Sequence, residues 1–133
     1  MAKILIVEDD AYTCDQLSYW LGKDHHITTL LRTADEVLDH LASLGNYDAI
    51  ILDLMMLRGK KLASVPGEKG ETGEILFEKI RERRPEMQVV ILSAREGEYL
   101  GERFGGQSDV HVIEKPLNET KMDKIRTIFG RTR

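Results

Sequence analysis

The sequence predicts an α/β fold, a doubly wound parallel sheet of five strands with helices on both faces. Short apolar runs alternate along the chain with segments whose apolar residues recur at helical spacing. Three of the runs are continuously apolar, which is typical of strands buried on both faces. Such strand-helix alternation favours right-handed crossovers and a parallel sheet. The predicted strands are residues 4–7, 27–31, 49–52, 89–92 and 110–113.

The first two helices are predicted from apolar residues spaced three or four positions apart. A loose stripe of Cys14, Leu17 and Leu21 follows the first strand. A longer stripe runs through residues 34–44, and residues 33–36 form a Thr-x-x-Glu capping box at its start. Each stripe is expected to face the sheet.

Capping residues and a proline delimit two later helices. Thr72 is expected to cap the third helix, which must end before Pro85. Asn118 is expected to cap the last helix, whose apolar face continues through Ile125 and Phe129. Both predictions rest on a short polar side chain that can accept a hydrogen bond from a free backbone N–H.

Two segments break the regular pattern. Residues 57–71 form a Gly-rich and charged loop after the third strand, longer than the usual strand-to-helix connection. Residues 97–106, where a fourth helix is expected, contain four glycines, each of which costs about 1 kcal/mol relative to alanine inside a helix. We therefore expect this helix to be short or mobile.

Length and composition fit one domain. The chain has 133 residues, of which 41% are hydrophobic, enough for a single core. The net charge of −4 argues against a free-standing nucleic-acid binder, which normally carries a basic face. No apolar run approaches the ~20 residues that a membrane-spanning helix needs, and the single cysteine excludes an internal disulfide. We expect a cytoplasmic domain that contacts neither membrane nor nucleic acid directly.

Polar side chains follow four of the five predicted strands at their carboxyl ends, the edge at which open parallel sheets bind ligands. They are the acidic run Glu8-Asp9-Asp10, then Asp53, Ser93 and Lys115. Clustered carboxylates repel one another unless a cation neutralises them, and oxygen ligands without histidine favour Mg²⁺. A carboxylate can also act as a nucleophile toward phosphorus, helped by a metal, a lysine and a hydroxyl. The set therefore indicates magnesium-dependent phosphoryl transfer to a carboxylate.

Four motifs in order resemble the receiver domains of response regulators in two-component signalling. They are Ile-Val-Glu-Asp-Asp (6–10), Ile-Ile-Leu-Asp-Leu-Met-Met (50–56), Val-Ile-Leu-Ser-Ala (90–94) and Glu-Lys-Pro-Leu (114–117). The resemblance implies the flavodoxin-like receiver fold with strand order 2-1-3-4-5. It covers nearly the whole chain, as a receiver domain at 1–130 with an inserted loop at about 57–71 and a tail at 131–133.

The resemblance assigns a role to each of three residues in phosphoryl transfer. Asp53 would be the phosphoacceptor, taking the phosphoryl group from a histidine kinase or a phosphotransfer protein. Ser93 would hydrogen-bond a phosphoryl oxygen, and Lys115 would pair with it. The Lys115-Pro116 peptide bond is often cis in the family. Such a domain catalyses its own phosphorylation and dephosphorylation and is a signalling switch rather than a metabolic enzyme.

The resemblance also implies the cofactor Mg²⁺. Asp9 and Asp53, together with the backbone carbonyl of Met55, would bind the ion, and Glu8 would hold a metal-bound water. The partner that receives the signal is expected to be either a separate protein that docks on the domain or an effector domain of a longer regulator.

The chain departs from the family pattern at three places that do not touch the phosphorylation chemistry. Val112 replaces the aromatic residue usual three positions before the lysine, so the usual aromatic switch is absent. Leu57 replaces a usual proline, and the loop at 57–71 is longer than normal. That loop is interpreted as a tolerated surface insertion in preference to a lid over the acidic edge. The glycines at 97–106 weaken a helix that most receivers use for output.

Two alternatives remain open at this stage. A pseudo-receiver that is never phosphorylated would act only as a protein-interaction module. A haloacid-dehalogenase-like phosphohydrolase also uses an aspartyl phosphate, but its nucleophile ends the first strand, whereas Asp53 ends the third. The second alternative is therefore the weaker.

Overall fold

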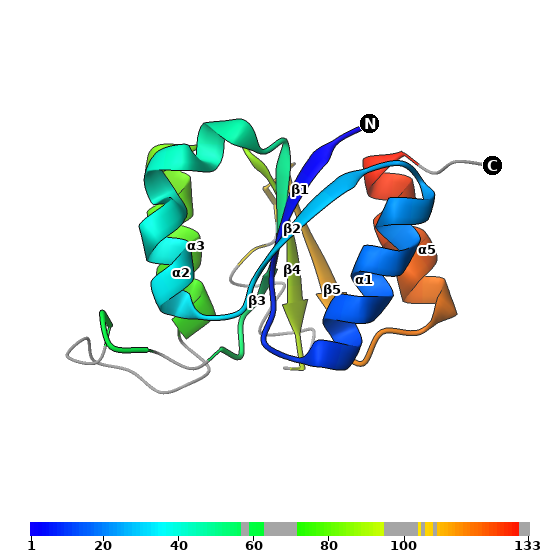
Figure 1. The fold of residues 1–133 in the computed structure, drawn as a ribbon, viewed down its shortest axis with the longest axis horizontal. Coiled ribbons are helices and arrows are strands. Elements are labelled where there is room, and N and C mark those ends of the chain that lie inside the picture. The colour runs from blue at the N-terminus through cyan, green and yellow to red at the C-terminus, as the bar shows by residue number, and fades with distance from the viewer. Residues whose placement is uncertain (57–58, 63–71, 95–103, 105, 108, 131–133) are drawn as a thin grey trace.

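Five parallel strands form one sheet in the computed structural model, which describes residues 1–56, 59–62, 72–94, 104, 106–107 and 109–130 (Figure 1). The strands lie in the order β2-β1-β3-β4-β5. This confirms the predicted parallel sheet and the strand order that the resemblance implied. The strands are β1 (Lys3–Val7), β2 (Ile27–Leu31), β3 (Ala49–Asp53), β4 (Gln88–Ser93) and β5 (Val110–Glu114).

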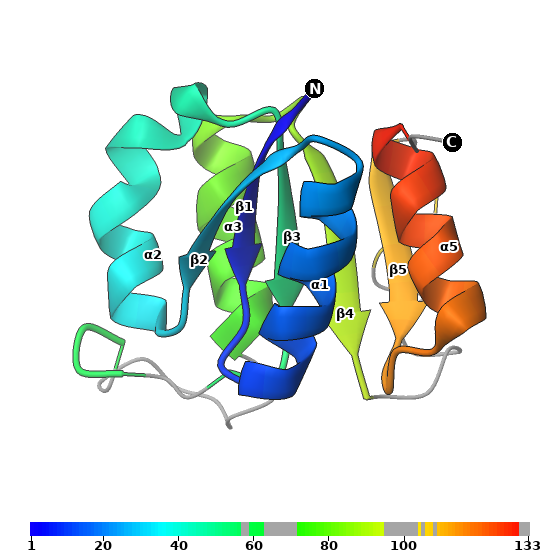
Figure 2. The ribbon, with the colours of Figure 1, turned by 45° about the vertical axis from the view of Figure 1, so that its right-hand side comes forward.

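Helices cover both faces of the sheet, α2 and α3 on one face and α1 and α5 on the other (Figures 1 and 2). They are α1 (Ala11–Lys23), α2 (Ala34–His40) with a 3-10 helix after it (Leu41–Asn46), α3 (Thr72–Arg83) and α5 (Glu119–Phe129). The predicted fourth helix at 97–106 lies outside the described residues except for Phe104 and Gly106. In the part of the chain that the structure describes, no helix is long and apolar enough to cross a membrane.

The core has two halves separated by the sheet. Successive residues of β3 point into opposite halves: Ile50 and Leu52 pack in the half beneath α2 and α3, and Ile51 packs in the half beneath α1 and α5. The same alternation along β1 and β4 explains why these strands are continuously apolar in the sequence.

Most of the predicted helix starts are confirmed. The Thr33 side chain accepts a hydrogen bond from the Glu36 N–H at 3.2 Å, and the Asn118 side chain accepts one from the Lys121 N–H at 2.8 Å. The prediction that Thr72 caps α3 is wrong, because the buried Thr72 hydroxyl has no hydrogen-bond partner among the described residues. The helix begins at Thr72 itself, and this residue is buried because the start of α3 packs against the end of β3.

A buried ion pair fastens α1 to α5. The guanidinium of Arg126 donates two hydrogen bonds to the Asp24 carboxylate, both at 2.7 Å, and lies 4.7 Å from the centre of the Trp20 ring. Both charged residues are buried. Removing one member leaves the other charge buried without its partner, which is more costly than losing an exposed pair.

We therefore expect Asp24→Ala to destabilise the fold far more than Asp39→Ala, which removes the exposed ion pair between Asp39 and Lys61. The loss in unfolding free energy should be larger by a factor of about three or more. Urea unfolding of both variants at neutral pH measures the two losses. Equal losses would contradict a structural role for the buried pair.

Candidate functional site

Polar residues that were predicted to cluster lie at the carboxyl ends of neighbouring strands, and the register of the sheet places them beside one another. Val7 of β1 pairs with Leu52 of β3, so the residues that follow them, Glu8 and Asp53, emerge side by side. Asp53 in turn pairs with Leu92 of β4, which places Ser93 one residue further along the neighbouring strand. Parallel pairing alone brings these three side chains to one edge.

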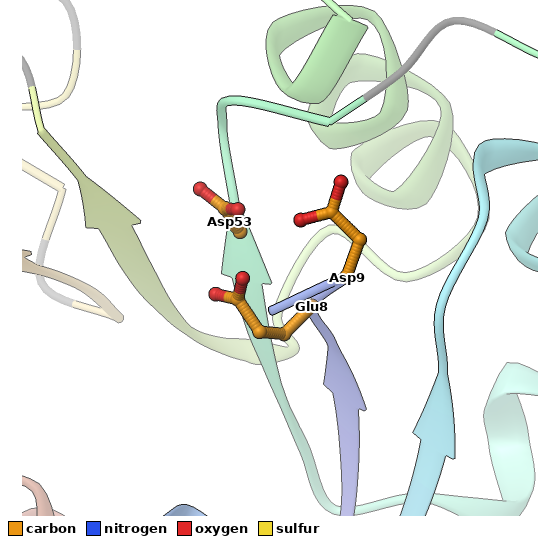
Figure 3. Close-up of side chains that lie close together, drawn as sticks. All are labelled: Glu8, Asp9 and Asp53. Atoms are coloured by element: carbon orange, nitrogen blue, oxygen red, sulfur yellow. The ribbon is translucent and has the colours of Figure 1, made fainter. Parts of the chain in front are cut away.

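Three carboxylates gather at this edge, those of Glu8, Asp9 and Asp53 (Figure 3). One oxygen from each lies within 4.8 Å of the others. Glu8 and Asp53 are buried, with 0% and 1% of their surface exposed, whereas Asp9 is exposed. The cluster therefore has two buried carboxylates and one carboxylate on the solvent side. Carboxylate oxygens are the ligands that Mg²⁺ prefers.

Lys115 supplies the positive charge at this edge. Its Nζ lies 3.1 and 3.2 Å from the two carboxylate oxygens of Glu8 and 3.5 Å from Asp53 Oδ2. Its backbone N–H donates to the Ser93 carbonyl at 2.8 Å, and the following peptide bond to Pro116 is cis, as the resemblance led us to expect. One ammonium group is thus shared between two buried carboxylates.

The Asp53 carboxylate is oriented by the backbone that follows it. Oδ1 accepts a hydrogen bond from the Met55 N–H at 3.0 Å, which leaves Oδ2 on the side of Lys115. The Leu54 N–H, between these two, donates to the Leu92 carbonyl at 3.0 Å and continues the sheet pairing one residue past β3. The two bonds fix the direction of the side chain.

Asp10 does not join the cluster. Its Oδ2 accepts hydrogen bonds from the Thr13 N–H at 2.9 Å and the Thr13 hydroxyl at 2.6 Å, so it is the N-cap of α1. The hydrogen bond from the Thr13 hydroxyl holds the pKa of Asp10 below its ordinary value. The Asp10 N–H also donates to Glu8 Oε1 at 3.1 Å and so helps to hold Glu8 in place.

Ser93 lies on β4, which pairs with β3, and Val112 lies on β5, which pairs with β4. Ser93 ends β4 and is fully buried. Val112 is partly buried on β5 and packs against the core half beneath α2 and α3. A valine has no ring that could rotate between an inner and an outer position.

Burial dominates the electrostatics of the cluster. It raises the pKa of Glu8 to about 7, and the neighbouring charge of Asp53 adds to the shift. For Lys115, burial works against the charged form, but the carboxylates of Asp53 and Glu8 outweigh it and raise the pKa of the ammonium group. In the absence of a metal ion, Glu8 therefore holds its proton over much of the range below neutral pH.

Sequence reasoning missed Gly73, whose N–H donates to the Leu54 carbonyl at 3.1 Å. This contact places the start of α3 directly against the residue after Asp53. A glycine in the first turn of a predicted helix, where it lowers stability, is the signal that could have identified it.

Comparisons with known proteins agree with this geometry. The family model described as "Response regulator receiver domain" matches residues 4–126. Among solved structures, the non-phosphorylated HemR receiver domain of Leptospira biflexa has a TM-score of 0.73 at 24% identity, covering 100% of this chain and 98% of that one. No curated protein sequence matches the chain.

Two further solved structures share the fold. A two-component response regulator from Clostridium difficile has a TM-score of 0.71 at 24% identity, covering 97% of this chain and 96% of that one. NtrX from Brucella abortus has a TM-score of 0.68 at 23% identity, covering 96% of this chain. The match spans 27% of the NtrX chain.

We expect the metal-free protein to lose stability as the pH rises from about 4.5 to about 7, because of Glu8. In this window the folded state keeps a proton on Glu8 that the unfolded state releases, so raising the pH favours unfolding. Urea unfolding with a chelator at several pH values measures the slope. Glu8→Gln, which cannot ionise, should flatten it, and an unchanged slope in this variant would contradict the assignment to Glu8.

Proposed function

The chain belongs to the family of response regulator receiver domains, and on that premise we propose that Asp53 is the phosphoacceptor of a two-component phosphorelay. The observation that carries the proposal is the environment of Asp53. Its carboxylate is buried at the end of β3, within 3.5 Å of Lys115 and inside a cluster of three carboxylates. Burying a charged group costs free energy unless it is well paired, and Asp53 shares the ammonium group of Lys115 with Glu8 instead of having a cation of its own among the described residues.

The proposed reaction transfers a phosphoryl group from a phosphohistidine of the donor, a histidine kinase or a phosphotransfer protein. A carboxylate oxygen of Asp53 attacks phosphorus, a P–O bond forms, and the P–N bond to the histidine breaks. The imidazole nitrogen leaves with the electron pair of that bond. Attack of water on the same phosphorus then returns Asp53 and releases inorganic phosphate, so the signal decays without a second protein.

The same cluster would hold Mg²⁺. Asp9, Asp53 and the backbone carbonyl of Met55 would bind the ion, and Glu8 would hold one of its waters. When bound, Mg²⁺ neutralises charge on the oxygens of the phosphoryl group. The exposed position of Asp9 places it on the side from which an ion and its waters would enter.

Lys115 and Ser93 would stabilise the phosphorylated state. The ammonium group of Lys115 is shared between Glu8 and Asp53 before phosphorylation. A phosphoryl group on Asp53 adds negative charge on that side, and Lys115 would pair with it at the expense of Glu8. The Ser93 hydroxyl would donate a hydrogen bond to a second phosphoryl oxygen. Lys115 lies in the connection between β5 and α5. A change of its ion-pair partner from Glu8 to the phosphoryl group would therefore carry the effect of phosphorylation to the surface formed by β5 and α5.

The output would pass to a separate protein or to an effector domain of a longer regulator. We place the receiver domain at residues 1–130, with the segment at about 57–71 as an insertion between β3 and α3. The alternative is a pseudo-receiver that binds partners without being phosphorylated, and the next experiment separates the two.

With Mg²⁺ and acetyl phosphate, the wild-type chain should gain the mass of one phosphoryl group in a base-labile form. Intact-mass spectrometry should find no adduct on Asp53→Asn or in excess chelator, whereas the exposed control Asp48→Asn should react like the wild type. A wild type without adduct would contradict the proposal and leave the interaction-only alternative. Steady release of phosphate at a high rate would indicate a hydrolase.

Asp9→Asn should weaken Mg²⁺ binding about tenfold or more, because it removes a charged ligand from the ion. Asp10→Asn is the matched control: it removes the neighbouring charge, and asparagine remains a good N-cap for α1. Isothermal titration calorimetry gives both dissociation constants at pH 8, where Glu8 is ionised. Equal affinities for the two variants would exclude Asp9 as a ligand.

A further inference from the structure

We propose that Gly73 is a positioning residue for the site, because it clamps the base of the long connection between β3 and α3 to the residue that follows Asp53. The clamp would make the geometry of the site independent of the inserted segment. The proposal rests on the proposed function of Asp53 and its magnesium site, and it extends that function to a residue outside the cluster.

The contact between Gly73 and Leu54 admits no side chain. A Cβ atom on Gly73 would lie 2.2 Å from the Cα of Leu54 and 2.8 Å from its carbonyl carbon and oxygen. All three are backbone atoms, which cannot rotate away as the end of a flexible side chain can. The hydrogen bond from the Gly73 N–H to the Leu54 carbonyl therefore forms only because residue 73 is a glycine.

Leu54 transmits this contact to the site. It lies between Asp53, whose carboxylate belongs to the cluster, and Met55, whose N–H orients that carboxylate. Its side chain is fully buried, and its N–H donates to the Leu92 carbonyl. Because Leu54 is held from both sides, pushing on its backbone from α3 must displace Asp53, Met55 or both.

The inserted segment is fastened elsewhere, on α2. The backbone N–H groups of Lys60 and Lys61 donate to the Asp35 carboxylate at 3.1 and 3.0 Å, and Leu62 is buried in the core half beneath α2 and α3. This turn lies near the start of α2 (Figure 2). Among the described residues of the connection, Lys60 and Lys61 are attached to α2, whereas the base at Gly73 is attached to Leu54, the residue next to Asp53.

Magnesium affinity separates a positioning role from a merely structural one. Gly73→Ala should bind Mg²⁺ about tenfold more weakly or worse than the wild type by calorimetry, since displaced ligand-bearing backbone costs affinity on this scale. Asp35→Asn, which weakens the distant attachment, and Gly22→Ala, whose added Cβ meets no atom within 4 Å, should bind like the wild type. Wild-type affinity in Gly73→Ala, or an equal loss in Asp35→Asn, would overturn the proposal.

Amide hydrogen exchange tests the clamp even if Gly73→Ala does not fold or the wild type binds no Mg²⁺. In the wild type, the Gly73 amide should exchange as slowly as the amides of β3. Asp35→Asn should accelerate exchange at Lys60 and Lys61 and leave Gly73 unchanged. Acceleration at Gly73 in this variant would overturn the clamp. Failure of the wild type to bind Mg²⁺ would instead refute the proposed magnesium site, which keeps the two failures distinct.

Discussion

Two buried carboxylates that share one ammonium group are the constraint on which the rest of this structure depends. Glu8 and Asp53 are almost completely withdrawn from solvent, and Lys115 is the cation within hydrogen-bonding distance of both among the described residues. Burial raises the pKa of Glu8, and the neighbouring charge of Asp53 adds to the shift, since the two carboxylates share one ammonium group. Such a site favours the binding of a further cation. It also holds the Asp53 carboxylate beside the ammonium group of Lys115, which could neutralise the negative charge of a phosphoryl group added to Asp53.

The sheet imposes this arrangement through its register. Because the side chains of a strand alternate between two faces, a shift of one residue between β1 and β3 would turn the side chains of the shifted strand toward the opposite halves of the core. Burial on both faces therefore fixes the pairing of Val7 with Leu52, and this pairing sets Glu8 beside Asp53. The apolar core and the acidic cluster are in this sense consequences of the same register.

The sequence was sufficient to predict the sheet, the strand ends and the residues of the cluster, because apolar periodicity and the direction of parallel strands need no tertiary information. These patterns alone could not assign different roles to three consecutive acidic residues, and only the resemblance distinguished Glu8 from Asp9. Glu8 is buried, Asp9 is exposed and Asp10 caps α1, and these differences arise from how the chain turns as it leaves β1. The contact of Gly73 with Leu54 and the pairing of Asp24 with Arg126 join residues distant in sequence. A glycine in the first turn of a helix marks position 73 as unusual, but the sequence does not show which residue it contacts.

The central claim is that the carboxylate of Asp53 accepts the phosphoryl group. Reduction with borohydride tests it most directly, since it converts an aspartyl phosphate to homoserine and leaves a free aspartate unchanged. The chain would be treated with Mg²⁺ and phosphoramidate, which like phosphohistidine carries a P–N bond, then reduced, digested and sequenced by mass spectrometry. The account predicts homoserine at position 53 and at no other aspartate. Homoserine at another aspartate, or none at any position, would contradict it.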